Sequence, residues 1–313
     1  MGKELIIGHT DGHGVSATAI TARFLKHVHK PFEVLCKFPD TGVIPKFWSE
    51  TIDKIIEKAE KYERIIILDI PLDAKNIQLS IKKLIELAER TEVIYVDHHQ
   101  SSAVDFDKPE NLIFSVVDSA YKCYWYYIND GVIPEILKIG AICDRDPKVF
   151  DLGVTNRELE IADGLDVLVR KDINEALDLL INAENMGEIE VELLKYANEI
   201  PNPTIAAVCG GVVVVKDVPQ SWKFKVLDKA CRQTRKDYAV TLTENQPDRA
   251  TGEPKDFVTA IKFWMSDKPS VKALLPDDLQ KIAIGHPDAI TISVPVGQGR
   301  TVLKRVLEAL RGE

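Results

Sequence analysis

The chain has 313 residues, of which 45% are hydrophobic and 28% are charged. This length predicts two domains, each with a core of its own, and the composition is typical of globular proteins. No stretch reaches the roughly 18 consecutive apolar residues of a membrane span, and the first residues do not resemble a signal peptide. We therefore expect a soluble, cytoplasmic protein without a membrane partner.

Net charge and cysteine spacing exclude further classes of protein. The 40 Lys and Arg residues against 49 Asp and Glu give a net charge of −9, so binding of long duplex nucleic acid would lack its main electrostatic drive. The five cysteines are scattered and form no CxxC pair, which excludes the usual zinc-finger spacings and gives no disulfide framework. Small phosphorylated partners fit this chain better, and a homodimer is compatible with it.

Short apolar runs and helix-length segments alternate in the first half of the chain. The runs that predict strands are residues 4–9, 32–38, 64–70 and 92–99. The segments between them have the pattern of helices, and the last of these opens on Asp73 as its N-cap; they are 14–30, 43–62 and 73–90. This alternation predicts an α/β fold with a parallel sheet and helices on both of its faces.

A second, smaller α/β domain is predicted for the last third of the chain. The pattern is helical from about Ser119 to Glu199, including 120–130, and the sequence PNP at 201–203 then marks a linker. Beyond it we expect strands within 204–218, 236–245, 256–264 and 288–295, and helices at 221–234 and 300–312. We therefore divide the chain into residues 1–200 and 204–313.

Polar side chains stand at the ends of three predicted strands. The first ends in His9-Thr10-Asp11-Gly12-His13-Gly14, the third in Asp69 and the fourth in Asp97-His98-His99. Ligands of parallel sheets bind at the carboxyl ends of the strands, and adjacent strands lie ~4.8 Å apart, so these side chains can converge on one pair of metal ions. Imidazoles mixed with carboxylates favour Mn²⁺ or another first-row ion over calcium or structural zinc.

Each of these groups also has a purely structural explanation. Asp69 could be a turn or helix-capping residue, and His9 could be a core histidine satisfied by hydrogen bonds. The triplet Asp97-His98-His99 is harder to explain in that way, because burying three such groups side by side is costly without a metal or many hydrogen bonds. The ensemble therefore indicates a metal site.

The motifs resemble those of the DHH phosphoesterase family. The string VDHHQSS at 96–102 carries the resemblance together with HTDGHG at 9–14, LDI at 68–70 and ICDRD at 142–146. It implies a DHH catalytic domain followed by a DHHA1-like substrate-binding domain, as in the oligoribonuclease and phosphoadenosine phosphatase members. It also implies two metal ions, Mn²⁺ first, with Mg²⁺ or Co²⁺ as alternatives.

The resemblance also implies roles for individual residues. One metal would be held by His9, Asp11 and Asp69, and the other by His13, Asp69, His98 and Asp144, with Asp69 as the bridge. His99 would face the substrate phosphate, and Asp97 would either orient the neighbouring histidine or take part in coordination. A water between the two metals would be the nucleophile, so no covalent intermediate is needed.

Two positions near these motifs leave alternatives open. The family usually has aspartate where this chain has His13, which makes the second metal site less negative and leaves a one-metal or inactive relative as an alternative. Asp146 is a second candidate in the fourth motif, but it precedes Pro147 and could simply shape the turn.

The second domain should supply substrate recognition. His286 lies in GHPDA at 285–289, which resembles a reduced form of the family's glycine-rich substrate loop; an ordinary loop histidine is the alternative. Arg232 and Arg235 could reach a phosphate or could stabilise the end of their helix. The segment 297–300 opens the last helix and could receive an anion, although a plain helix start explains it equally well.

The function expected from these features is metal-dependent hydrolysis of a small nucleotide phosphoester. A short oligonucleotide or a 3′-phosphorylated adenosine nucleotide is the first choice of substrate. The alternatives are a single-strand-specific exonuclease, a pyrophosphatase, and a catalytically degenerate protein that only binds nucleotides.

Overall fold

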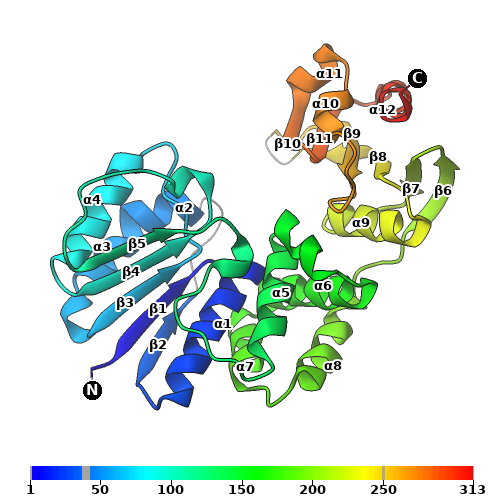
Figure 1. The fold of residues 1–313 in the computed structure, drawn as a ribbon. Helices are drawn as coiled ribbons and strands as arrows, with labels where there is room; N and C mark the ends of the chain where they lie inside the picture. The colour runs from blue at the N-terminus through cyan, green and yellow to red at the C-terminus, as the bar shows by residue number, and fades with distance from the viewer. Residues whose placement is uncertain (1, 37–42, 249–250, 313) are drawn as a thin grey trace. The chain divides into compact units, whose positions relative to one another are not determined.

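The computed structural model describes residues 2–36, 43–248 and 251–312, and the chain folds into two compact units, Met1–Ala197 and Asn198–Glu313 (Figure 1). The border between the units lies a few residues before the PNP sequence. Among the described residues, no helix is long and apolar enough to cross a membrane.

The first unit is built on a five-stranded sheet in the order β2-β1-β3-β4-β5, and every pair of neighbours is parallel. The strands are β1 (Glu4–Gly8), β2 (Phe32–Leu35), β3 (Arg64–Leu68), β4 (Glu92–Asp97) and β5 (Leu112–Val116). The first four were predicted. The edge strand β5 was not, although its sequence LIFSV is mostly apolar; as an edge strand it is only partly buried apart from Leu112.

Helices cover both faces of this sheet, as predicted (Figure 1). Successive residues of a strand point to opposite faces, so Ile65 and Ile67 of β3 join a core with Trp48 and Leu84, while Ile66 joins a core with residues of α1. The helices are α1 (Gly12–His27), α2 (Val43–Lys46), α3 (Ile52–Ile56), α4 (Ile77–Ala88), α5 (Ile133–Cys143), α6 (Asn156–Lys171), α7 (Ile173–Asn182) and α8 (Met186–Ala197). A π-helical turn, Phe47–Thr51, joins α2 to α3.

Two local predictions for this unit were wrong. The predicted helix at 120–130 is only a short 3₁₀ turn, Ala120–Lys122, followed by irregular backbone in which the Tyr126 ring stacks on Phe24 at 4.4 Å. Its aromatic residues have low helix propensity, and packing decides their conformation instead. Asp73 is not an N-cap: α4 begins at Ile77, and the Asp73 carboxylate accepts a hydrogen bond from the Lys75 N–H within the preceding turn.

The second unit is a six-stranded mixed sheet in the order β10-β11-β9-β8-β7-β6. Its strands are β6 (Thr204–Cys209), β7 (Val212–Lys216), β8 (Tyr238–Pro247), β9 (Pro254–Lys262), β10 (Ala283–His286) and β11 (Ala289–Pro295). Only β7 and β8 pair in parallel, through α9 (Lys223–Thr234), and the other neighbours are antiparallel. The predicted smaller α/β domain is thus confirmed.

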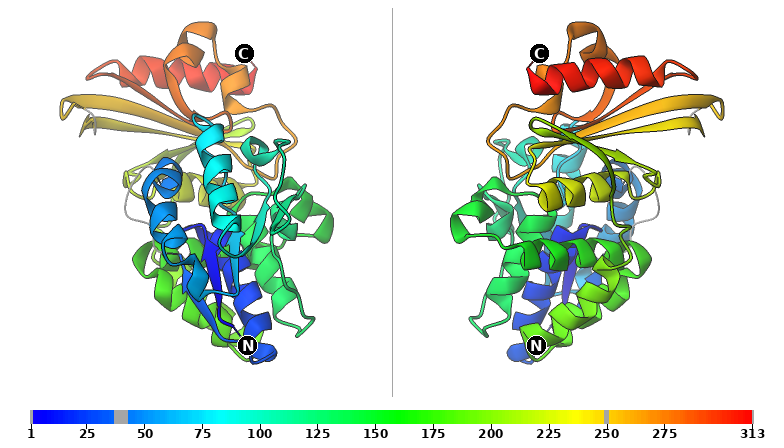
Figure 2. Two further views of the ribbon diagram at one scale, coloured as in Figure 1. Left: turned by 90° about the vertical axis from the view of Figure 1, so that its left-hand side faces the viewer. Right: turned by 90° about the vertical axis from the view of Figure 1, so that its right-hand side faces the viewer.

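Residues are buried on both faces of this sheet: Val213, Ala239 and Ile261 alternate along their strands with the residues of a larger core on the opposite face. Val240, Val258 and Ile290 pack there against Val302 and Val306 of α12 (Gly299–Arg311), which runs across that face (Figure 2). Two short helices, α10 (Val271–Leu274) and α11 (Asp277–Ile282), lead into β10.

Candidate metal centre

A glycine-rich turn brings the end of β1 against the start of α1. Asp11 is the N-cap of α1, and its carboxylate accepts a hydrogen bond from the Gly14 N–H at 2.9 Å. A Cβ at Gly14 would lie 2.5 Å from the Cβ of His9, and one at Gly12 would lie 2.7 Å from the Cys143 Sγ. The two glycines therefore permit the close packing that places His9, Asp11 and His13 together.

Asp69 occupies the centre of the site in an unusual backbone conformation. It directly follows β3, has φ of 60°, and donates its N–H to the carbonyl oxygen of Val96 at 2.9 Å. Aspartate tolerates this left-handed region better than most residues, and such strain is retained mainly where function needs it. The side chain is 1% exposed, so its carboxylate is held inside the edge of the sheet.

The two oxygens of Asp69 face different histidines. Oδ2 lies 2.9 Å from Nδ1 of His13 and 4.0 Å from Nδ1 of His9. Oδ1 lies 3.1 Å from Nε2 of His98 and 3.8 Å from Nδ1 of His99. A carboxylate with imidazoles on both sides has the arrangement of a ligand that bridges two cations.

Two further carboxylates complete the cluster. The Asp11 Oδ2 is 2.5 Å from Nδ1 of His9, and the Asp144 Oδ2 is 3.5 Å from Nε2 of His98. Asp144 is the C-cap of α5, whereas Asp146 accepts hydrogen bonds from Ser119 and from the Lys148 N–H at 2.9 Å, so it shapes the turn. The structure therefore brings all six predicted metal ligands to one place. In three sets of these and neighbouring residues, the possible ligand atoms lie within 4.8 Å of one another: His9/Asp11/Asp69, His13/His98/Asp144 and Asp69/Asp97/His98/His99.

Two buried atoms at the centre are suited to a metal. Nδ1 of His13 and Oδ2 of Asp69 are 2.9 Å apart, yet neither has a hydrogen-bond partner among the described residues. Nε2 of His13 lies 3.0 Å from the carbonyl oxygen of Ala120 and must donate to it, which leaves Nδ1 with a free lone pair in the neutral ring. Both atoms can bind a metal once His13 has lost its Nδ1 proton, and a first-row cation held by both would take the place of that proton.

The imidazoles and carboxylates of the cluster shift one another's pKa values. Burial alone would lower the pKa of His13, but the adjacent Asp69 carboxylate raises it to about 10. Burial would raise the pKa of Asp69, but the His13 charge holds it well below the usual range. Burial dominates at Asp144 and raises its pKa to about 6. A cation entering the cluster would therefore replace protons on the imidazoles.

Asp97 serves His99 rather than the centre of the cluster. It is fully buried, and its Oδ1 accepts from Nδ1 of His99 at 2.7 Å. Its Oδ2 accepts from Ser102 and lies 3.2 Å from the hydroxyl of Tyr95. Sequence reasoning missed Tyr95 and Ser102, as it missed Cys123, whose sulfur lies within 4.8 Å of ligand atoms of His13 and Asp69. The only sequence signal was the nearness of Ser102 to the histidine pair.

The predicted substrate residues of the second unit differ in exposure: Arg232 is nearly buried, and Arg235 and His286 are exposed. Arg232 forms an ion pair at 3.2 Å with Asp228 on the same helix, and both side chains are nearly buried. Arg235 is exposed at the left-handed C-cap of α9. His286 is exposed at the end of β10, and its Nδ1 accepts from the Asp288 N–H at 3.3 Å.

The start of α12 already holds a carboxylate. The Asp256 Oδ2 accepts from the N–H groups of Gly297 at 2.8 Å and Gly299 at 3.1 Å, and its Oδ1 accepts from the Asn245 N–H at 3.0 Å. These hydrogen bonds lower the pKa of Asp256. The plain helix start is therefore the correct interpretation of 297–300, because an internal anion fills the place considered for a ligand.

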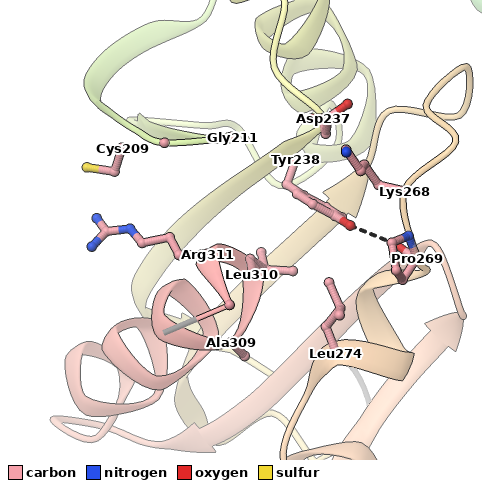
Figure 3. A pocket seen from close by; sticks show the side chains of 12 residues that line it. Cys209, Gly211, Asp237, Tyr238, Lys268, Pro269, Leu274, Ala309, Leu310 and Arg311 are labelled. Carbon is pink, nitrogen blue, oxygen red and sulfur yellow. Dashed lines mark hydrogen bonds between the residues drawn. The ribbon is translucent and has the colours of Figure 1, made fainter.

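A separate hollow lies in the second unit near the C-terminal end of α12 (Figure 3). Its volume is about 640 Å³, and Tyr238, Leu274 and Leu310 form an apolar wall beneath charged groups of Asp237, Lys268 and Arg311. None of the predicted substrate residues of this unit lines it.

Comparison with known proteins supports the fold. No protein-family model and no curated protein matches the sequence. Among solved structures, the pGpG-specific phosphodiesterase PggH from Vibrio cholerae matches with a TM-score of 0.54 and 12% identity over 98% of this chain and 99% of that chain. The DHH-type fold inferred from the motifs is thereby confirmed.

Two structures of the exonuclease RecJ are also similar. One, bound to manganese, matches with a TM-score of 0.48 and 15% identity over 99% of this chain and 90% of that chain. The other, from Thermus thermophilus in complex with Mn²⁺, matches with a TM-score of 0.49 and 16% identity, and this chain covers 52% of it.

Proposed function

We propose that this protein is a metal-dependent phosphoesterase whose first unit carries the chemistry. The observation that carries the proposal is the convergence of imidazoles and carboxylates on Asp69, with the buried Nδ1 of His13 2.9 Å from Oδ2 of Asp69 at its centre. The DHH-type fold supports the same conclusion, because it places these groups at the carboxyl edge of a parallel sheet, where ligands bind.

Two ions would share the cluster. His9, Asp11 and Asp69 would hold one, and His13, Asp69, His98 and Asp144 would hold the other. When bound, such a pair acidifies a water molecule and neutralises charge on the phosphoryl oxygens. Mn²⁺ is our first choice, since the donors are both imidazoles and carboxylates, while Mg²⁺ prefers an all-oxygen shell.

His99 would contact the substrate phosphoryl group. Its Nδ1 is bonded to Asp97 at 2.7 Å, so only Nε2 is left for a substrate, and the side chain is partly exposed. Burial would lower the pKa of His99, but the hydrogen bond to Asp97 raises it to about 9. With Nδ1 bonded to Asp97, an Nε2–H of the protonated ring can donate to a phosphoryl oxygen.

The substrate class proposed is a small nucleotide phosphoester. The net charge of −9 disfavours long nucleic acids, and the Vibrio cholerae protein of this fold is described as specific for the dinucleotide pGpG. The second unit, proposed as the DHHA1-like domain, would supply recognition through His286 and Arg235. Arg232 is a weaker candidate because its guanidinium is nearly buried beside Asp228.

Hydrolysis by metal-stripped protein with Mn²⁺ added back tests the proposal. The substrate panel contains pGpG, short oligoribonucleotides, 3′-phosphoadenosine 5′-phosphate, pyrophosphate and long single-stranded DNA. We expect Mn²⁺-dependent turnover of one small nucleotide, which Asp69→Asn abolishes. Asp172→Asn is the matched control, because Asp172 caps α7 and asparagine caps a helix as well.

The outcomes separate the alternatives. Preference for pyrophosphate would indicate a pyrophosphatase, and preference for long single-stranded DNA would indicate a single-strand-specific exonuclease. Either result would contradict the proposed substrate class. Tight nucleotide binding without turnover in the presence of any divalent ion would contradict the enzymatic proposal and support a nucleotide-binding protein.

A further inference from the structure

A buried hydroxyl network surrounds the carboxylate of Asp97. Ser102 is fully buried, donates its O–H to Oδ2 of Asp97, and accepts the backbone N–H of Leu72 at 3.0 Å. The serine therefore uses its donor and an acceptor lone pair on groups from two different segments.

Tyr95 adds a second hydroxyl to the network. Its oxygen lies 2.8 Å from the carbonyl oxygen of Ile70, 2.8 Å from Oγ of Ser102 and 3.2 Å from Oδ2 of Asp97. The Tyr95 ring is fully buried and stacks on Phe114 at 4.7 Å, so the position of the hydroxyl is fixed by packing. The Tyr95 hydroxyl has one proton, so it donates to one of these three neighbours at a time: the Ile70 carbonyl, Oγ of Ser102 or Oδ2 of Asp97.

The network joins the chain on either side of the metal centre. Ile70 and Leu72 lie one and three residues after Asp69, and Tyr95 and Asp97 belong to β4, just before His98. The two hydroxyls therefore fix the segment after Asp69 to the carboxylate that holds His99. Because that segment leaves Asp69 in a left-handed conformation, these hydrogen bonds also restrain the central ligand.

The orientation of His99 depends on this carboxylate. With Oδ2 of Asp97 held by Ser102, Oδ1 points at Nδ1 of His99 at 2.7 Å. Without the hydroxyl donors the carboxylate could rotate about its side-chain bonds, and the imidazole would lose the partner that selects which ring nitrogen faces outward.

We propose that Ser102 and Tyr95 are positioning residues that hold Asp97 so that His99 presents Nε2 to the substrate phosphoryl group. The inference rests on the proposed phosphoesterase function for its kinetic consequence. Neither hydroxyl touches the substrate or a metal; both act through Asp97.

Two readouts test the proposal on the 313-residue chain. The first is the imidazole N–H spectrum of ¹⁵N-histidine-labelled protein with Mg²⁺, which is diamagnetic; His99→Gln identifies the downfield Nδ1–H signal. The second is steady-state kinetics with Mn²⁺. The variants are Ser102→Ala and Tyr95→Phe, where Tyr95→Phe keeps the packed ring. Ser80→Ala is the matched control, because Ser80 is also fully buried and accepts a backbone N–H, that of Asp73, at 3.1 Å.

We expect the His99 signal to move upfield or to exchange faster with water in Ser102→Ala and Tyr95→Phe. Their kcat should fall about 10- to 100-fold, the range typical of residues that orient ligands, with KM changed less than about twofold. Ser80→Ala should behave as wild type in both readouts.

The proposal is overturned if Ser102→Ala and Tyr95→Phe keep both the His99 signal and kcat of the Ser80→Ala control. A rise in KM with unchanged kcat would also overturn it, since that pattern means lost ground-state binding. If no version of the protein hydrolyses any substrate, the phosphoesterase function fails, while the imidazole signal still decides whether the hydroxyls position His99.

Discussion

The predicted site residues of the first unit lie together, whereas those of the second unit have different surroundings. In the first unit, polar residues that follow parallel strands meet around the buried Asp69. In the second unit, the candidates differ in exposure, with Arg232 nearly buried in an ion pair and both Arg235 and His286 exposed. The carboxyl ends of parallel strands share one edge, so order along the chain predicts proximity there, whereas a mixed sheet gives no such rule. A metal centre can thus be inferred from sequence more securely than a substrate surface.

The largest effect is expected from removing the central carboxylate. Asp69→Asn keeps the shape but loses the charge that faces four histidines, so hydrolysis should fall by more than the ~100-fold typical of residues that only orient ligands. Mn²⁺ binding, followed by calorimetry, should weaken in parallel. Activity within tenfold of wild type would contradict the role of Asp69 as the central metal ligand.

The identity of the metal should depend on His13. Replacing its imidazole with a carboxylate in His13→Asp makes the donor set more favourable to Mg²⁺, so the preference for Mn²⁺ over Mg²⁺ should fall by about tenfold. Competition between the two ions, measured by calorimetry, gives the ratio of affinities without reference to turnover. An unchanged ratio would mean that His13 does not bind the metal.

Metal affinity should rise with pH. Burial lowers the pKa of His13, but Asp69 raises it to about 10, and burial raises the pKa of Asp144 to about 6, so both groups carry protons below these values that a cation must displace. Each displaced proton should strengthen Mn²⁺ binding by about tenfold per pH unit below the pKa of its group. Calorimetry in two buffers of different ionisation enthalpy counts the released protons. Affinity that stays constant between pH 6 and pH 8 would contradict this coupling.

The smallest effect is expected in the second unit. His286→Ala and Arg235→Ala should each raise KM by about tenfold, the loss of roughly one hydrogen bond to a charged group, and leave Mn²⁺ affinity unchanged. Steady-state kinetics with the small nucleotide identified by the substrate panel measures both. If KM is unaffected in both variants, recognition does not use these residues.

Much of the fold was predictable because buried parallel strands have a continuous apolar signature. The four predicted strands of the first unit and its helices on both faces follow from that signature. The edge strand β5 was missed although its sequence is mostly apolar. The aromatic spacing of 120–130 resembled that of a helix, but the segment is irregular and its Tyr126 ring stacks on Phe24. Local propensity was overridden by tertiary contacts in that segment.

For the site, sequence order located the charged groups but not the neutral ones. The hydroxyls of Tyr95 and Ser102 contact Asp97, and the Ala120 carbonyl contacts His13, yet nothing in the sequence marks these three neutral residues as part of a metal site. Their roles depend on hydrogen-bond geometry, which no spacing rule conveys. The same limit applies to Arg232, whose pairing with Asp228 is visible only in the folded helix.

The most direct test of the central claim is electron paramagnetic resonance of metal-stripped protein titrated with Mn²⁺. Two ions held on either side of Asp69 would lie about 3.5–4 Å apart, so we expect a spin-coupled signal that saturates at two Mn²⁺ per chain and is lost in Asp69→Asn. A signal of isolated Mn²⁺ at every ratio, unchanged in Asp69→Asn, would contradict it.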